Sequence, residues 1–327
     1  MYYNETAELI QGDNMKKIIL LLILLIAMPF ISLYAQEDGV TSSGELVLQL
    51  STLPEAKLGY THTFRFPMLQ GDNPLTEGNN LRLQLTAEVS PVSLNGIFKA
   101  VLTPIAFLEF SAGARAGAGW PINLFGSDIY GTGLNLSGTD ERSGYKGSAF
   151  DALLWKGFAG GTFQFDLAAI VPGDWNHVVF LTYHEINYHA NTSANANEAW
   201  YFENDDGENL NGFNYYGNFV IGYQMPIFLS MVALLAEMNQ NLYDTPGRGL
   251  WGDDLIRWHF SGILNFTINE KFGIALITQF RTRRNFTNFD EHKDDNPQLH
   301  FQSRILDKSD PLRLEFYRVA AIVSLKF

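Results

Sequence analysis

Apolar and polar positions alternate with a period of two along much of the chain. In the stretch "LRLQLTAEVS" (81–90), leucine, alanine and valine take the odd positions, and arginine, glutamine, threonine, glutamate and serine take the even ones. Successive side chains of a β-strand point to opposite faces, so this pattern predicts a strand with one apolar and one polar face. Repeats of the pattern predict about ten strands, at residues 45–67, 79–90, 96–120, 150–171, 177–190, 213–225, 227–241, 256–268, 271–286 and 311–327.

Several of these segments exceed the roughly 9–11 residues with which a β-strand crosses a bilayer. The alternation continues through Pro104, so we interpret 96–120 as one long strand that projects beyond the membrane surface. A hairpin inside one of the longer segments would raise the strand number to twelve, because the number must be even if both termini lie on one side.

The connections between the segments fall into two length classes. Turn-like stretches rich in Pro, Gly, Asn and Asp alternate with longer polar loops. The short ones are 90–95, 172–177, 225–226 and 269–270, and the long ones are 69–79, 121–149, 190–212, 243–255 and 287–311. Short turns on one rim and long loops on the other are typical of an outer-membrane barrel, whose short turns are periplasmic.

A soluble antiparallel sheet also alternates, but its polar face meets solvent and can be rich in Lys and Glu. Here the polar face mixes Arg, Glu, Gln, Thr and Ser, which favours a confined and mutually paired interior. Lipid cannot hydrogen-bond an open sheet edge, so a sheet in a membrane must close. The sequence therefore predicts an all-β fold, a closed antiparallel transmembrane β-barrel formed by residues 36–327.

The amino-terminal segment indicates export. Two lysines, an apolar run of 18–31 and a small residue before Gln36 are the parts of a secretory signal peptide, which we place at 15–35. The apolar run is shorter than the roughly 20 residues of a spanning helix. Residues 1–14 precede the signal, so we interpret them as an extension from a misplaced start codon. The chain has no cysteine, which excludes both a lipoprotein anchor and a disulfide scaffold.

The last segment, "FYRVAAIVSLKF", keeps its apolar positions to the final residue. We expect it to pair with the first strand and close the barrel, with a bulge near Phe316–Tyr317, where the parity of the apolar positions changes. Its apolar positions also resemble the carboxy-terminal signal that is read by the machinery that inserts outer-membrane barrels. The residues of this predicted signal are Tyr317, Val323, Leu325 and Phe327.

Charged residues on the polar parity are predicted to line the barrel lumen. They are Arg82, Glu88, Lys99, Glu109, Arg115, Asp166, Glu185, Glu237, Arg257, Arg281 and Arg283. Eight strands are already filled by side chains and porins use sixteen or more, so a ten-strand barrel with near-balanced charge predicts a largely filled lumen. The net charge of −13 makes nucleic acid an unlikely partner.

Candidate chemistry is sparse. "YHEINYH" contains His184, Glu185 and His189, but it lacks the helical H-E-x-x-H spacing, so we predict no metal site and no cofactor there. "FENDDGENLNG" holds acidic residues that could bind a cation, although the spacing of a calcium loop is absent. A group of residues near the outer rim, as in outer-membrane proteases, is the enzymatic alternative. Its members would be Asp253, Asp254, His259 and His189.

Four stretches resemble the integral β-barrel outer-membrane proteins of spirochaetes, particularly treponemes. They are "FQFDLAAIVPGDWNHVV", "WYFENDDGENLNGFNYYGNFVIGYQMPIFL", "DTPGRGLWGDDL" and "FGIALITQFRTRRNF". The resemblance spans most of 44–327 and implies location and architecture, but no active site. We expect a barrel that acts through its extracellular loops or as a narrow solute pore, with an omptin-like hydrolase as the alternative. The partners expected are outer-membrane lipid, the insertion machinery and an extracellular ligand or small solute.

Overall fold

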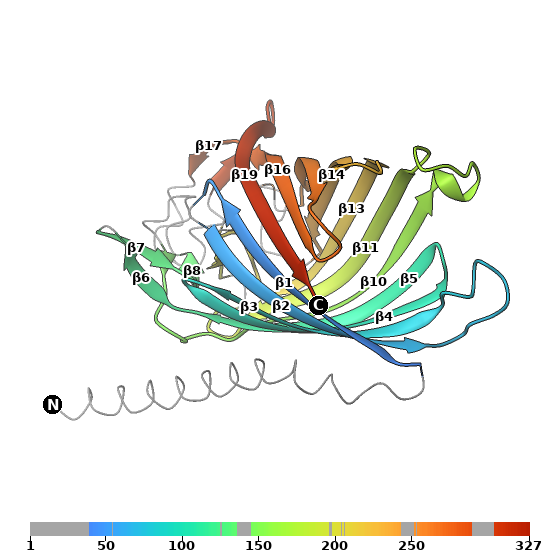
Figure 1. Cartoon of the computed structure of the whole chain (residues 1–327). Coiled ribbons are helices and arrows are strands. Elements are labelled where there is room, and N and C mark those ends of the chain that lie inside the picture. Colours follow the sequence, from blue (N-terminus) through green and yellow to red (C-terminus); the bar gives the residue numbers. More distant parts are fainter. Residues whose placement is uncertain are drawn as a thin grey trace, which may run out of the picture.

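The fold is a closed antiparallel barrel of twelve strands, which confirms the predicted fold class (Figure 1). The computed structural model describes residues 39–327 except 54, 125, 136–144, 196–197, 204, 206, 243–251, 253 and 290–303, so the predicted signal peptide and the segment before it lie outside the described residues. Among the described residues, no helix is long and apolar enough to span a membrane.

The barrel strands follow one another around the wall in chain order, and the last pairs with the first. They are β1 (Thr41–Ser51), β2 (Glu55–Pro67), β3 (Asn80–Ser90), β4 (Ser93–Ile105), β5 (Leu108–Gly119), β10 (Leu154–Asp166), β11 (Val178–Asn191), β13 (Gly212–Gln224), β14 (Leu229–Asn241), β15 (Arg257–Thr267), β16 (Phe272–Arg284) and β19 (Leu312–Lys326).

Short strands lie in the connections. Among the described residues, they are β6 (Pro121–Leu124), β7 (Ser127–Tyr130), β8 (Thr132–Asn135), β9 (Tyr145–Lys146), β12 (Trp200–Phe202), β17 (Phe286–Phe289) and β18 (Arg304–Leu306), and a 3-10 turn, η3 (Leu167–Ala169), follows β10. β12 pairs with β8, so two connections that are distant in sequence form one small sheet.

Two predicted single strands are hairpins, and the interpretation of 96–120 as one strand is wrong. Segment 45–67 divides into β1 and β2, and 96–120 divides into β4 and β5 at Ala106 and Phe107. The pairs Ser51↔Glu55 and Leu102↔Phe110 join residues of equal parity. The alternation therefore runs through each turn without a change of phase, and periodicity alone does not detect the reversal.

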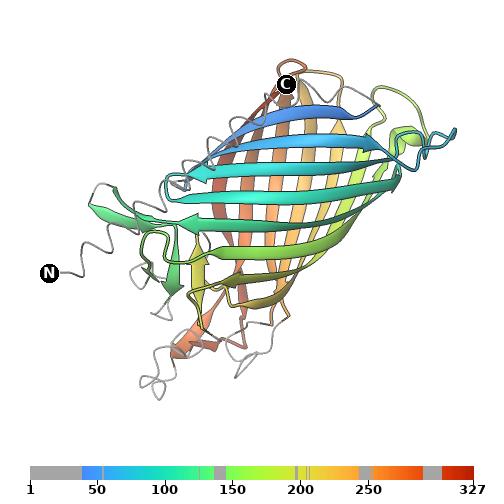
Figure 2. The ribbon, with the colours of Figure 1, turned by 90° about the horizontal axis from the view of Figure 1, so that it is seen from below.

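The two hairpins also change which rim carries which connection. We call the rim where β1 begins and β19 ends the terminal end, and the opposite rim the loop end. The long connections after β5, β11, β14 and β16 all leave from the loop end, where Figure 2 shows β6, β7 and β17. The loop 68–79, predicted with them, lies at the terminal end, and the turn at 91–92 lies at the loop end.

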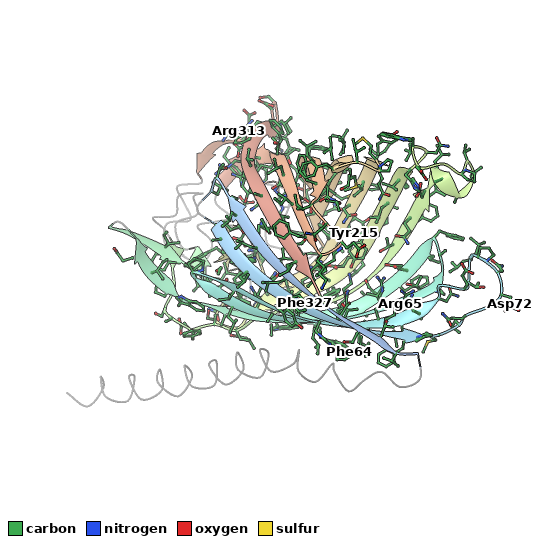
Figure 3. All side chains as sticks on the ribbon, viewed as in Figure 1. Phe64, Arg65, Asp72, Tyr215, Arg313 and Phe327 are labelled. Atoms are coloured by element: carbon green, nitrogen blue, oxygen red, sulfur yellow. The ribbon has the colours of Figure 1, made fainter. Side chains whose placement is uncertain are left out.

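The strand register places almost all of the charged side chains on one face of the barrel. Antiparallel partners point to the same face, and following the pairs around the barrel places nearly every Asp, Glu, Lys and Arg of the twelve strands on one face. All twelve strands are described, and Arg284, at the loop end of β16, is the exception. Figure 3 shows the separation at Phe64 and Arg65, which point away from opposite sides of β2.

The charged face is the inner face. Gln279 of β16 donates to Glu237 of β14, and Tyr183 of β11 contacts Ser111 of β5, each across an intervening strand. Such contacts are favoured on the concave side, where side chains converge. The other face exposes large apolar side chains, including Leu234 at 65% and Ile221 at 55%.

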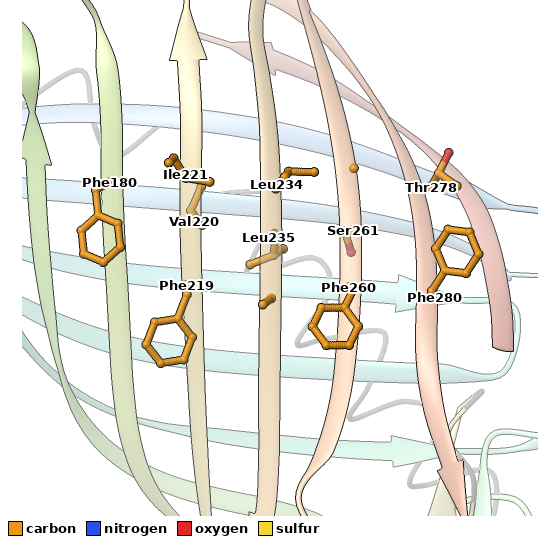
Figure 4. A pocket seen from close by; sticks show the side chains of 12 residues that line it. Phe180, Phe219, Val220, Ile221, Leu234, Leu235, Phe260, Ser261, Thr278 and Phe280 are labelled. Carbon is orange, nitrogen blue, oxygen red and sulfur yellow. The ribbon is translucent and has the colours of Figure 1, made fainter. Parts of the chain in front are cut away.

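The outer face carries an apolar hollow of about 750 Å³ on β13 to β16 (Figure 4). Ala236 and Gly262 lie at its base, and neighbouring strands contribute Phe219, Phe260 and Phe280. The hollow forms because small residues lie beside large aromatic rings. Its lining is almost entirely apolar.

The barrel closes through the chain terminus. The backbone of Phe327 exchanges hydrogen bonds of 2.7 and 3.0 Å with Gly44, and its ring stacks on Tyr60 at 6.0 Å. A Cβ at Gly44 would lie 2.6 Å from the Phe327 ring, so glycine leaves the space that the ring occupies.

The predicted bulge in β19 is present, since Gln279 pairs with Arg318 whereas Phe280 pairs with Phe316. Tyr317 is the extra residue, and Arg281 of the inner face lies 4.3 Å above its ring. The expectation that Tyr317 shares the outer face with Val323 and Leu325 is therefore wrong, because a bulge re-aims the side chain at its own position.

Candidate functional site in the barrel interior

The eleven residues predicted to line the lumen all lie on the inner face. Ion pairs join four of them: Arg82 with Glu109 at 2.5 Å, and Arg115 with Glu88 at 4.0 Å. Asp166 pairs with His177 at 2.7 Å, close to the terminal end. The remaining members lie on other strands of the same wall: Lys99, Glu185, Glu237, Arg257, Arg281 and Arg283.

Glu185 organises one polar network. Its carboxylate accepts hydrogen bonds from Tyr183 at 2.7 Å and from Asn187 at 3.0 Å, and it pairs with Lys156 at 2.6 Å. The Lys99 ammonium lies 5.5 Å above the Tyr183 ring. Strands β4, β10 and β11 thus meet in one cluster of cations around a single carboxylate.

Glu237 organises a second network. Tyr216 donates to it at 2.7 Å and Gln279 at 3.4 Å, and Arg318 donates to Gln279 at 3.0 Å. Arg318 also pairs with a residue of β2, Glu55. The rings of Tyr183 and Tyr216 are 6.1 Å apart, so the two networks are neighbours.

Sequence reasoning missed several inner-face partners. Lys57 and Glu55 lay within a segment interpreted as one strand, while Arg318 and Glu315 lay beyond a parity change. Glu315 pairs with Arg281 at 2.9 Å. Periodicity could have found them. Once the hairpin and the bulge are placed, each of these residues occupies a polar, inward-facing position of its own strand.

Water reaches the inner wall. The side chains of Arg82, Arg115 and Lys156 keep 30%, 31% and 32% of their accessible surface despite their ion pairs. A close-packed interior would leave such side chains with almost none. The described wall around these cations is therefore open to water and is not close-packed.

One half of the inner wall is apolar. Between the middle and the terminal end of β13, β14, β15, β16 and β19, the inner face carries aliphatic side chains and a single charge, Lys326. The aliphatic side chains are Val220, Leu235, Ile263, Ile277 and Ile322. The lumen therefore has an aliphatic side and a charged side at the same depth.

A carboxylate from a long loop reaches into the loop end. Glu203, just after β12, pairs with Lys57 at 2.6 Å and accepts hydrogen bonds from Ser93 at 2.7 Å and Asn95 at 3.2 Å. Its backbone N–H donates to Gly131 at 2.7 Å. Its φ is +56°, which is uncommon outside glycine, so these contacts hold a strained backbone.

The electrostatic balance at Glu203 favours its charged form. Burial alone would raise the pKa of this carboxyl, but attraction by the Lys57 ammonium and hydrogen bonds from Lys57 and Ser93 together outweigh burial. The pKa of Glu203 therefore lies below its ordinary value. The ion pair between Glu203 and Lys57 therefore joins the loop that follows β11 to β2, a strand near the start of the chain.

The predicted catalytic candidates are dispersed. His189 Nε2 donates to the Leu210 carbonyl at 3.0 Å and its ring contacts Trp200, whereas His259 lies 5.6 Å from the Tyr317 ring. His184 lies on the outer face and contacts Tyr215. Asp253 lies outside the described residues.

The described carboxylates of the acidic loop have partners in the loop or on the barrel wall. Asp205 accepts hydrogen bonds from the backbone N–H groups of Phe202 at 3.0 Å and Gly207 at 2.9 Å, and from Asn209. Glu208 pairs with Arg284. Among the described residues, no group of three or more His, Asp or Glu side chains has a geometry that could hold a metal ion.

No protein-family model and no curated protein matches the chain. Among solved structures, it is similar to a KdgM porin (TM-score 0.39, 8% identity, covering 87% of this chain and 98% of that one). It is also similar to a NanC porin (TM-score 0.38, 5% identity, 88% and 99%) and to OmpF of Salmonella typhi (TM-score 0.30, 9% identity, 88% and 97%).

Proposed function

We propose that the chain is an outer-membrane barrel that forms a narrow aqueous pore for small solutes, with a preference for anions. The observation that carries this proposal is that every charged side chain of the twelve strands except Arg284 lies on an inner wall that water reaches. A soluble sheet has no reason to hide every carboxylate and ammonium of twelve strands inside a cylinder while exposing Leu234 and Ile221. A barrel in acyl chains requires that arrangement.

Aromatic residues at both ends of the outer face support placement in a membrane. Toward the loop end, Tyr188 stacks on Trp155 and meets Phe213 edge to face, with ring distances of 5.1 Å to each. At the terminal end, the Tyr223 hydroxyl donates to the Trp175 carbonyl at 2.9 Å. Amphipathic rings at two levels are typical of the lipid–water interfaces of barrels. The apolar hollow on β13 to β16 would then be filled by acyl chains.

The preference for anions follows from the sign of the inner wall. Although the whole chain carries a net charge of −13, cations outnumber carboxylates on the inner face of the strands. The inner cations are Lys57, Arg65, Arg82, Lys99, Arg115, Lys156, Arg257, Arg281, Arg283, Arg313, Arg318 and Lys326. The inner carboxylates are Glu45, Glu55, Glu88, Glu109, Asp166, Glu185, Glu237 and Glu315.

Conductance in planar lipid bilayers tests this function. We expect discrete current steps from the purified protein, and a reversal potential in a KCl gradient whose sign reports chloride as the more permeant ion. Replacing both Arg82 and Lys99 by glutamine should shift the reversal potential toward potassium selectivity. Current no greater than leak would refute the pore and favour a barrel that acts through its loops, and a potassium-selective wild type would refute the charge argument.

We also propose that the chain is related to spirochaete outer-membrane barrels, and that its terminal strand serves as an insertion signal. The contacts of Phe327 with Gly44 and Tyr60 support the second, because they place the terminal strand at the seam where the barrel closes.

A further inference from the structure

A pocket of about 210 Å³ lies inside the loop end, between the barrel wall and the inward-folded loop that carries β12. Strands β5, β10 and β11 supply three basic side chains, and the loop supplies two aromatic ones. They are Arg115, Lys156, His189, Trp200 and Phe202. Because one water occupies about 30 Å³ of liquid, the pocket has room for about seven waters, the size of a single substituted ring.

The cations retain donors for a ligand. The Arg115 guanidinium uses its Nε–H on Asn95 at 3.1 Å, and Glu88 is 4.0 Å from one terminal nitrogen, so further N–H groups remain on its fork. The Lys156 ammonium has three N–H groups, of which Glu185 accepts one at 2.6 Å. Two cations that face one cavity from adjacent strands can bind both oxygens of a carboxylate.

The carboxylate that lines the pocket is hydrogen-bonded within its own loop. Asp205 accepts hydrogen bonds from its own loop, from Phe202, Gly207 and Asn209. Its charge is thereby stabilised by loop donors, and the cations of the strands face the cavity. Of the charged side chains that line the pocket itself, Arg115 and Lys156 are cations and Asp205 is a carboxylate, while the ion-pair partners Glu88 and Glu185 are not among the lining residues.

The aromatic residues favour a flat ligand. Trp200 meets the His189 ring edge to face at 5.0 Å, and the Arg115 guanidinium lies 4.9 Å from the Phe202 ring. His189 donates through Nε2 to a carbonyl, so its Nδ1 is an acceptor in the neutral ring. A ring that enters the pocket would contact Phe202 and the small accessible part of Trp200, which is 4% exposed, and its acidic group would contact the cations.

We propose that this pocket is a recognition site for small carboxylates that carry one ring, and that it selects the solutes entering the pore. The inference rests on the proposed pore for its role, but the binding site itself is tested separately. The aliphatic side of the lumen beyond it, at Val220, Leu235 and Ile277, suits the ring of such a solute during passage.

The test is calorimetric titration of the full mature barrel, folded in detergent micelles, with four probes. Benzoate and cyclohexanecarboxylate carry a ring and a charge, benzamide carries the ring alone, and acetate carries the charge alone. We expect saturable binding of one or both ring carboxylates, and at least tenfold weaker binding of benzamide and acetate. Benzoate without cyclohexanecarboxylate would assign the site to aromatic acids.

The variants Arg115→Gln and Lys156→Gln should each weaken benzoate binding about tenfold to a hundredfold, the effect of removing a charged hydrogen bond. Lys308→Gln makes the same charge change on an exposed turn at the loop end, outside the pocket, and should leave binding unchanged. Heat-sensitive mobility on an SDS gel identifies the folded variants, and either pocket variant suffices for the comparison.

The outcomes separate this inference from the proposed pore. Saturable binding without conductance would refute the pore and leave the site standing. Conductance without saturable binding, equal affinity for benzoate and benzamide, or an equal loss in Lys308→Gln would overturn the site and leave the pore standing.

Discussion

Replacing Leu276 by arginine should destabilise the barrel strongly, because its side chain points into lipid. Leu276 is 42% exposed on the outer face, where its neighbours across the strands are Leu264 and Ala321. It lies four residues from Phe272 at the terminal end of β16. At about 3.3 Å per residue and a tilt of about 40°, this places it roughly 10 Å inside the rim.

That depth is close to the middle of an apolar band about 25 Å tall, where an arginine costs about 2–4 kcal/mol. No carboxylate of the twelve strands lies on the outer face to offset the charge. The matched control is Thr162→Arg, on the inner face of β10 and likewise four residues from the terminal-end residue, Asp166. Its neighbour across the strands is Glu109, so the new guanidinium meets a carboxylate, and we expect a cost below about 1 kcal/mol.

The assay is equilibrium urea unfolding in lipid vesicles, with linear extrapolation of the free energy of unfolding. Equal costs for the two variants, or a larger cost for Thr162→Arg, would refute the assignment of inner and outer faces. Gln279, inward and nearer in sequence, is a poorer control, because it is buried and bonds to Ser261, Glu237 and Arg318.

Two further predictions concern the seam and the loop. Phe327→Ala should cost about 2 kcal/mol in the same unfolding assay, about half of the usual loss for a buried phenylalanine, because the ring is 55% exposed but stacks on Tyr60; an unchanged free energy would mean that the seam does not depend on the ring. Glu203 has a lowered pKa, so its contact with Lys57 should be fully present above the ordinary glutamate pKa of about 4.3 and lost as the pH falls through the lower folded value. The tryptophan fluorescence of the wild type should therefore change only below about pH 4, and that change should be absent in Glu203→Gln; a change centred above pH 5 would contradict the electrostatic argument.

The alternation with a period of two predicted most of the architecture. Lipid on one side and a charged lumen on the other impose an apolar face and a polar face on every strand. The alternation failed where parity gives no information. A turn that joins residues of equal parity, as at Ser51 and Glu55, leaves the alternation unbroken. In contrast, the turn between Ser90 and Ser93 joins residues of opposite parity, and there the boundary was predicted.

The residues of the inner face could be predicted from the sequence, but the pocket at the loop end could not. Arg82, Glu109 and Glu185 follow from parity alone, since each takes the polar position of its strand. Glu203 and Lys57 are 146 residues apart, and no local pattern brings a loop carboxylate onto a strand lysine. The pocket depends on that fold of the loop, so its basic and aromatic members could be assigned to one site only from the structure.

Site-directed spin labelling along β10 tests the central claim most directly. The chain has no cysteine, so single cysteines can be introduced at consecutive positions 158–164 without background. In lipid vesicles, we predict that labels at Ala159, Gly161 and Phe163 collide mainly with oxygen dissolved in lipid, and that labels at Phe158, Thr162 and Gln164 collide mainly with a water-soluble nickel complex. The two accessibilities should oscillate with a period of two and in opposite phase. Equal accessibility to the nickel complex at adjacent positions would contradict a barrel with acyl chains outside and water inside.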